Sequence, residues 1–257
     1  MKMAGLLSTA AALVLILAAV SEAVPTQLVV RAKSKDAKFI GTSMGGALVI
    51  IRDSETGEIL AKGLTAGSTG STQKIMTDPL RRGVPISDAT SAKFETTLDI
   101  SEPRLLTIEV RSPYSQRQSM TKNTAQVWLL PGKHVTGDGI VIEVPGFVVD
   151  ISAPQSPDLV RLADGKATVT VKADVSMMCG CTLTPGGMWD SDTYEISAVV
   201  KLDGRLVATV PMKYSGKPSY FEAAVDLTKG GVYEVTVYAY DQKTGNTGLD
   251  RTTFTAF

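Results

Sequence analysis

The sequence predicts an all-β protein of two tandem antiparallel β-sandwich domains that follow a cleaved signal peptide. Apolar and polar residues alternate with a period of two in many short segments after residue 24, as in strands with one buried face. Gly, Pro, Asp and Asn separate these segments at close spacing, which is typical of the turns of a sandwich. Helical periodicity is scarce, and one uninterrupted apolar run stands near the N-terminus.

That apolar run predicts a secretory signal over residues 1–23. It extends from Leu6 to Val20 and is followed by the small residues of Ser21-Glu22-Ala23, a pattern typical of a cleavage site. A run of this length is shorter than the roughly 20 residues that a membrane-spanning helix needs. We therefore expect Val24 to be the first mature residue and the protein to be exported, to the periplasm or to the cell surface. No later stretch is long and apolar enough to predict a transmembrane span.

The first domain is predicted over residues 24–152. Its expected strands are 27–31, 47–51, 59–61, 93–100, 105–111, 125–130, 140–144 and 147–151, of which the last closes the domain. The polar stretch 66–91, which contains Arg81 and Arg82, predicts a long loop, and such loops are common positions for partner contacts.

The hairpin at the start of this domain resembles a known family. Gly46 to Thr65 (GALVIIRDSETGEILAKGLT) is similar to the opening hairpin of transthyretin-like domains, which occur as regulatory modules beside carboxypeptidases. The resemblance implies a transthyretin-like sandwich, although the long segment 66–91 departs from the compact version of that fold.

The second domain is predicted over residues 153–257, after a connector at 152–157 in which two prolines interrupt any strand. Its patterning is the clearest in the chain. Apolar residues alternate with polar ones in four stripes, at Val169, Val171, Ala173 and Val175; at Tyr194, Ile196, Ala198, Val200 and Leu202; at Phe221, Ala223, Val225 and Leu227; and at Tyr233, Val235, Val237 and Ala239.

The end of this second domain also resembles a known family. Tyr233–Asp241 (YEVTVYAYD), Thr244–Gly248 (TGNTG) and Thr252–Phe254 (TTF) resemble the closing strands of bacterial Ig-like domains. The resemblance implies an Ig-like sandwich and says little about function, because this fold carries many functions.

Composition excludes several classes of function. Lys and Arg total 26 and Asp and Glu total 26, so no basic surplus favours nucleic acid as a partner. The single histidine, His134, excludes any site that needs two imidazoles from one chain. No serine stands in a Gly-x-Ser-x-Gly nucleophile motif. We therefore expect a protein that is not an enzyme.

One short segment carries a chemical signal. Both cysteines, Cys179 and Cys181, and three of the nine methionines, Met177, Met178 and Met188, fall within twelve residues. If the preceding strand continues, Met177, Cys179 and Cys181 share one face of it. Thiolate and thioether sulfurs are ligands that favour Cu(I), with the adjacent Trp189 placed to cover the ion.

Three interpretations of this segment stay open. The first is a Cu(I) or other soft-metal site formed by Met177, Met178, Cys179, Cys181 and Met188. The second is a Cys179–Cys181 disulfide with a mainly structural role, because exported chains with two cysteines usually oxidise them. The third is thiol–disulfide chemistry, or two buried thiols packed as small hydrophobic groups.

These interpretations lead to two main functional hypotheses. The first is a non-enzymatic exported binding or accessory protein with a Cu(I) site. The second is a structural subunit of an envelope or surface assembly, which contacts another envelope or extracellular protein through segment 66–91 and the outward-facing Tyr238 and Tyr240. A thiol oxidoreductase is a third hypothesis. Near the last hairpin, the side-chain oxygens of Asp241, Asn246 and Asp250 are of the type that binds Ca²⁺. We favour the other interpretation, in which these residues only form the turn of the hairpin.

Overall fold

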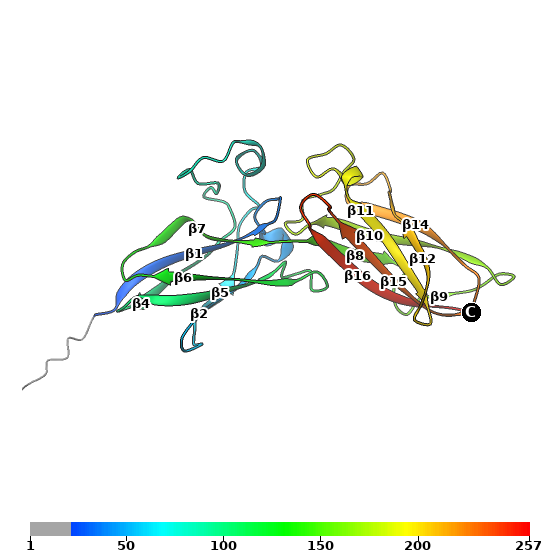
Figure 1. Cartoon of the computed structure of the whole chain (residues 1–257), viewed down its shortest axis with the longest axis horizontal. Helices are drawn as coiled ribbons and strands as arrows, with labels where there is room; N and C mark the ends of the chain where they lie inside the picture. Colours follow the sequence, from blue (N-terminus) through cyan, green and yellow to red (C-terminus); the bar gives the residue numbers. More distant parts are fainter. Residues whose placement is uncertain (1–21) are drawn as a thin grey trace, which may run out of the picture.

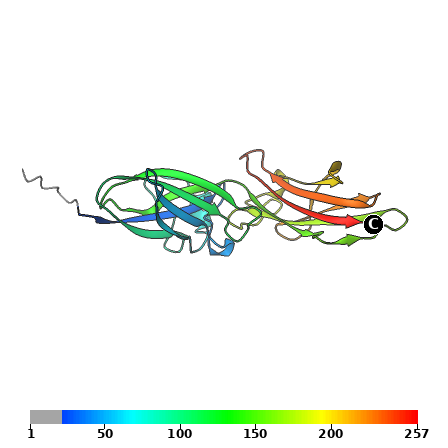
Figure 2. The ribbon, with the colours of Figure 1, turned by 90° about the horizontal axis from the view of Figure 1, so that it is seen from below.

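The computed structural model describes residues 22–257, so the predicted signal peptide lies almost wholly outside the described residues. Nearly all regular structure in this part of the chain is β-strand, which confirms the predicted fold class. Two sandwiches lie end to end along the long axis of the molecule, and their separation is visible in both ribbon views (Figures 1 and 2). None of the helices within residues 22–257 combines the length and the apolarity of a membrane span.

The first sandwich contains two sheets. Its strands are β1 (Val24–Ser34), β2 (Leu48–Asp53), β3 (Ile59–Leu64), β4 (Phe94–Ile100), β5 (Arg104–Ser112), β6 (Thr121–Leu129) and β7 (Val135–Val144). One sheet has the order β4-β1-β7 and the other has the order β3-β2-β5-β6. The β1–β7 pair is parallel, whereas the other pairs in this sandwich are antiparallel.

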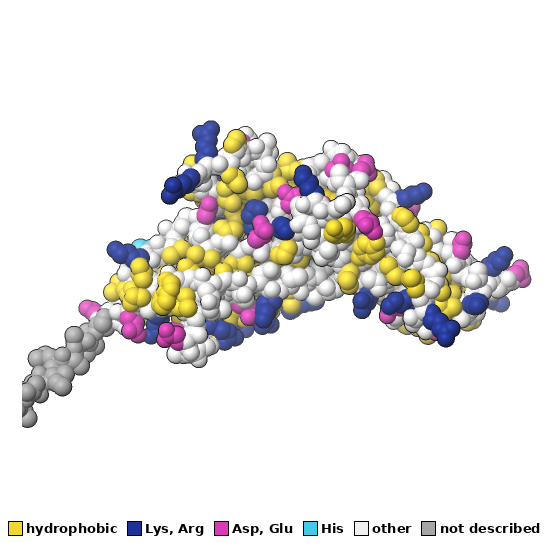
Figure 3. All heavy atoms as spheres, viewed as in Figure 1, with side chains coloured by type: hydrophobic (Ala, Val, Ile, Leu, Met, Phe, Trp, Pro, Cys, Tyr) yellow, Lys and Arg dark blue, Asp and Glu magenta, His cyan; other side chains and the backbone are white. Residues whose placement is uncertain are grey.

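The segment predicted as a long loop is anchored to the first sandwich. A short π-helical turn, η2 (Gln73–Thr77), interrupts segment 66–91. The guanidinium of Arg31 is buried and donates to the carbonyl of Ser91 at 2.5 Å, while the carboxylate of Asp138 accepts from the backbone N–H of Ser87 at 2.9 Å. The tip of the segment projects from the molecule and presents basic side chains, which Figure 3 shows in dark blue.

The second sandwich also contains two sheets. Its elements are β8 (Phe147–Ala153), β9 (Leu159–Val160), β10 (Ala167–Met177), η3 (Ser191–Thr193), β11 (Glu195–Leu202), β12 (Arg205–Pro211), β13 (Lys213–Tyr214), β14 (Tyr220–Leu227), β15 (Gly231–Tyr240) and β16 (Thr247–Ala256). The sheet orders are β13-β14-β10-β8 and β12-β11-β15-β16-β9. The first order corresponds to strands D-E-B-A of an Ig fold, and the second contains strands C-F-G.

A tyrosine corner supports the Ig-like assignment of this second sandwich. Tyr233 lies near the start of β15, and its hydroxyl donates to the carbonyl of Lys229, four residues upstream, at 2.9 Å. Its buried ring stacks on Phe254 of β16 with centroids 5.2 Å apart. In Ig domains a tyrosine at this corner makes the same kind of bond to upstream backbone. The closing strands therefore have both the sequence pattern and the local geometry of that fold.

The domain boundary lies earlier than the sequence predicts. Residues 147–151 were expected to close the first domain, with the division at residues 152–153. Instead β8 pairs with β10 of the second sandwich, in a register that joins Val149 to Val175. The division therefore falls at Pro145-Gly146, between β7 and β8. The prolines at 154 and 157 end β8, but they do not determine which sheet that strand joins.

The two sandwiches are packed against each other. Their buried apolar residues form a single cluster that includes Ile40 and Met44 from the first domain and Phe147 and Met178 from the second. A two-residue linker, Pro145-Gly146, separates the last strand of one domain from the first strand of the next. The short linker and the shared core fix this contact region, which we call the junction.

Candidate functional site at the domain junction

The sulfur-containing segment forms a turn at the junction. Strand β10 ends at Met177, whose N–H donates to the carbonyl of Cys181 at 3.0 Å, while the N–H of Gly180 donates to the carbonyl of Met177 at 2.7 Å. Gly180 has a φ of 76°, in the left-handed region that glycine adopts without a steric penalty. The strand therefore does not continue through the cysteines, and the expectation that the sulfurs of 177, 179 and 181 share one strand face is wrong. We call residues 177–181 the sulfur turn.

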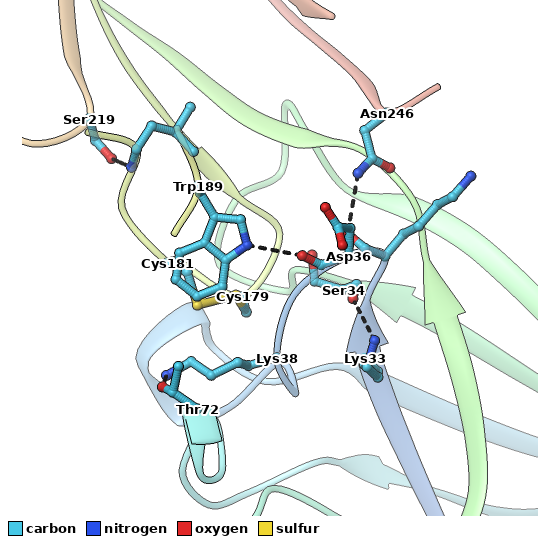
Figure 4. The surroundings of a disulfide bond; sticks show 12 residues. Lys33, Ser34, Asp36, Lys38, Thr72, Cys179, Cys181, Trp189, Ser219 and Asn246 are labelled. Atoms are coloured by element: carbon cyan, nitrogen blue, oxygen red, sulfur yellow. Dashed lines mark hydrogen bonds between the residues drawn. A yellow bond between two sulfur atoms is a disulfide. The ribbon is translucent and has the colours of Figure 1, made fainter. Parts of the chain in front are cut away.

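Within the sulfur turn the two cysteines lie at disulfide-bonding distance. Their Cα atoms are 5.4 Å apart, inside the usual range for a bridge, and both side chains are buried (Figure 4). A sulfur held in a disulfide is not a thiolate, and the thiolate is the form that binds a metal or attacks another disulfide. In this state the pair clips the turn.

The other predicted ligands are distributed around the turn. Met177 and Met178 are buried, and the methyl group of Met178 lies close to Gly146 of the linker. Met188 lies in the following loop and is 53% exposed. Within the described part of the chain, no three His, Cys, Asp or Glu side chains gather as a metal site.

A methionine from the other domain packs on the sulfur turn. Met44, at the end of η1 (Thr42–Met44), is 8% exposed. A Cβ atom added at Gly180 would lie 2.5 Å from the Sδ atom of Met44. Glycine is therefore required at this position both by the backbone angle and by the closeness of the first domain. Sequence reasoning missed Met44, which lies far away in the chain and has no cysteine or methionine beside it.

Hydrogen bonds hold the junction beside the turn. The indole N–H of Trp189 donates to the carbonyl of Asp36 in the first domain at 2.9 Å, as Figure 4 shows. A second bond between the domains joins Ser119, just before β6, to Val149 on β8: the hydroxyl of Ser119 accepts from the N–H of Val149 at 3.1 Å. Trp189 thus connects the two domains by a hydrogen bond, a role different from the metal-covering one considered from the sequence.

Asn246 links three segments at the junction. Its side chain is completely buried, its Oδ1 accepts from the N–H of Gly146 at 2.9 Å, and its Nδ2 donates to the carbonyl of Lys35 at 3.2 Å. The amide therefore joins the β15–β16 turn, the linker and the residue that follows β1. An amide suits this position because one donor and one acceptor face it from opposite sides.

The two acidic neighbours of Asn246 have separate partners. The carboxylate of Asp241 accepts from the N–H of Lys243 and from the hydroxyl of Thr244, inside its own turn. The carboxylate of Asp250 accepts from the N–H of Ile151, on strand β8. Turn and strand contacts therefore account for both carboxylates.

The charges of three carboxylates act on Tyr194 at the junction. Tyr194 packs edge to face on Phe147, with ring centroids 5.1 Å apart. Burial, together with the charges of Asp241, Asp36 and Asp190, raises the pKa of Tyr194 to about 12. Its hydroxyl therefore stays protonated at any physiological pH.

A cavity of about 640 Å³ opens between the two sandwiches next to the sulfur turn. Its walls come from both domains and consist of Gln118, Ser119, Met120, Thr121, Phe147, Met178, Glu195, Tyr238, Ala239, Tyr240, Thr247, Gly248 and Leu249. Tyr238 and Tyr240, expected from the sequence to contact a partner protein, are half-buried in this wall. We call it the interdomain cavity.

Comparison with solved structures finds matches at low identity and with low TM-scores. An engineered protein is 22% identical over 50% of this chain, with a TM-score of 0.31, and this chain spans only 24% of its length. The fibronectin(III)-like modules of CbhA from Clostridium thermocellum are 11% identical, with coverage of 81% and 77% and a TM-score of 0.29. A chimeric titin Z1Z2 carrying a peptide from decorin is 10% identical, with coverage of 92% and 97% and a TM-score of 0.25.

No protein-family model and no curated protein matches the chain. The Ig-like assignment of the second sandwich consequently rests on its own strand order and tyrosine corner.

Proposed function

We propose that the protein is a non-enzymatic exported binding protein that acts as a rigid structural or accessory unit of an envelope or surface assembly. The observation that carries this proposal is the junction. The oxidised sulfur turn of one sandwich packs on Met44 of the other, and the two apolar cores are continuous. Such an arrangement suits a protein that holds two β-sandwiches in a fixed relation and presents their surfaces to a partner.

The export step of this proposal rests on the N-terminal pattern. Residues 1–23 have the apolar run and the small residues of a cleavable signal, and an oxidised cysteine pair is typical of an oxidising compartment.

We also propose that the first sandwich is related to transthyretin-like domains. This relationship is supported by the β2–β3 hairpin, which pairs Leu48 with Leu64 within the region of the sequence resemblance.

The experiment compares the natural protein with the variant C179S/C181S in envelope extracts. The full-length chain is expressed with its leader, fractionated and sequenced from its N-terminus, and we expect the mature chain to begin at Val24. We expect the same stoichiometric partner with both proteins, because the turn contributes rigidity and not the contact surface. Retention of the protein in the cytoplasm, or loss of the partner only when the cysteines are absent, would contradict the structural role.

Cu(I) binding is the second candidate function, and it is favoured by the packing of Met44 on the sulfur turn. Its Sδ atom lies against the sulfur turn, so a reduced Cys179–Cys181 pair has a thioether from the other domain as a neighbour. The test is metal analysis of protein purified from the periplasm, with and without reductant. Less than about 0.2 equivalents of copper in the reduced protein excludes this function, since a soft-metal site of thiolates binds Cu(I) tightly. Stoichiometric copper that disappears in C179S/C181S supports it.

A further inference from the structure

The interdomain cavity has the size and position of a small-molecule site. Its volume of about 640 Å³ lies within the range of ligand pockets, and such pockets favour the interfaces between domains. Strand ends from both sandwiches line the cavity, and Figure 1 shows these strand ends in the region between the two domains. The first domain contributes residues 118–121 at the start of β6, and the second contributes the start of β8 and the β15–β16 strands.

The walls of the cavity are rich in aromatic and sulfur-containing side chains. Phe147 and Met178 form its buried floor, and Met120, Tyr238 and Tyr240 add half-buried surface. The faces of aromatic rings carry negative electrostatic potential, and thioethers are polarizable. An apolar or aromatic body fits these walls, and a cation placed over the tyrosine rings is attracted by them.

The charge of the cavity wall has one sign. Glu195 is the single charged residue among the cavity-lining residues that the structure describes, and no Lys, Arg or His lines the space. It takes part in none of the ion pairs found within residues 22–257. Its Oε1 accepts a hydrogen bond from the hydroxyl of Tyr238, and this bond raises the pKa of Tyr238, which therefore stays neutral. Glu195 is exposed, and its carboxylate is therefore available to a cationic group of a ligand.

We propose that the interdomain cavity binds a small amphiphilic cation, with an apolar or aromatic body against Phe147 and Met178 and a protonated amine beside Glu195 and Tyr238. The proposal rests on the fixed junction of the proposed function, because both domains form the walls. An anionic ligand of the same shape meets an unpaired carboxylate and is disfavoured.

The test uses three probes of nearly equal shape, phenylbutylamine, phenylbutanol and phenylbutyrate. Their binding to the oxidised mature protein is measured by titration calorimetry at pH 7 and low salt. We expect the amine to bind at least about tenfold more tightly than the carboxylate, with the alcohol between them. E195Q keeps an oxygen that accepts from Tyr238 but removes the charge. It is expected to bring the amine to within about threefold of the alcohol. The matched control is E222Q, on the exposed face of β14, which is expected to change no affinity.

A second pair of variants tests the location. T121R adds a cation at the exposed edge of the cavity, whereas T124R adds the same charge further along β6, outside the wall. We expect T121R to weaken binding of the amine by about tenfold or more and T124R by less than about twofold. Equal affinities for amine and carboxylate, no binding of any probe, or an unchanged preference in E195Q would overturn the proposal.

The unfolding of the natural protein separates this proposal from the one on which it rests. Two separate unfolding transitions in urea contradict the fixed junction of the proposed function. A single transition combined with equal affinities for the amine and the carboxylate contradicts only the assignment of the ligand.

Discussion

Replacing the amide of Asn246 by a carboxyl group should destabilise the junction in a pH-dependent manner. The amide is fully buried, accepts from Gly146 N–H and donates to Lys35 C=O. N246D keeps the acceptor but loses the donor, so at neutral pH a carboxylate faces the carbonyl oxygen of Lys35. An unpaired buried polar group costs about 1–3 kcal/mol and a charged one more, so we expect a loss of about 3–4 kcal/mol at pH 8.

The loss should shrink in acid. Burial and the neighbouring carbonyl raise the pKa of the introduced carboxyl in the folded state, by about 2 units, above its unfolded value of about 3.9. A raised carboxyl pKa means that the folded state binds the proton more tightly. The penalty is therefore complete above the folded pKa and falls as the pH drops toward about 4. There the protonated oxygen donates to Lys35 again, and a loss of about 1 kcal/mol remains.

Urea unfolding at pH 8 and pH 4 measures this difference. It is followed by tryptophan fluorescence, to which Trp189 contributes with an indole that is hydrogen-bonded across the junction. N123D serves as the control, because the Asn123 amide donates only to the hydroxyl of Thr121 in an exposed pair. We expect the control to change the free energy of unfolding by less than about 0.5 kcal/mol at both pH values. If the loss in N246D is equal at pH 4 and pH 8, the carboxyl is not buried against a carbonyl and the description of the junction is wrong.

Three further predictions concern the second sandwich. Y233F removes the hydroxyl of the tyrosine corner and should lower the free energy of unfolding by about 1 kcal/mol, measured in urea. D174N should raise it at pH 7 by less than about 1 kcal/mol. Burial first and then the charge of Asp150 raise the pKa of Asp174, so this gain should vanish as the pH falls toward 3, and a gain that grows in acid would contradict it. C179A/C181A opens a ring of only three residues and should cost about 1.6 kcal/mol on the chain-entropy estimate. A loss above about 4 kcal/mol would mean that the bridge does more than clip the turn.

The strands were predictable because their signal is local. In β10 the alternation of Val169, Val171, Ala173 and Val175 with polar residues follows from the two-residue repeat of a strand with one buried face. The sequence alone therefore determined the fold class and most strand positions. It did not determine which sheet each strand joins, and for this reason β8 was assigned to the wrong domain. Pairing of β8 with β10 depends on the packing of the whole sandwich.

The candidate site was predictable only where its residues are neighbours in the chain. The close spacing of Cys179 and Cys181 predicted that they act together, and the structure places their sulfurs at disulfide-bonding distance. Met44 was not identified from the sequence, and Asn246 was interpreted only as a turn residue or a Ca²⁺ ligand, because each acts through a contact with a distant segment. The bond from Asn246 to Lys35 spans 211 residues, and no local pattern marks such a pair. Met177, Cys179 and Cys181 do not share one strand face, because Gly180 bends the chain between the cysteines.

The junction and the interdomain cavity are formed by the same residues, so stability and binding are linked. Phe147 and Met178 belong both to the core that joins the sandwiches and to the floor of the cavity. A cation that binds only the docked state must stabilise the docking, by about 1.4 kcal/mol at a concentration of ten times its Kd. N246D loosens the docking without touching the cavity wall, so the amine probe should raise the midpoint of urea unfolding in N246D as well as in the natural protein. E195Q should show less of this stabilisation at the same amine concentration, while keeping its stability without ligand. The contrast between the two variants is expected if one arrangement of the two domains creates both the rigid joint and the binding site.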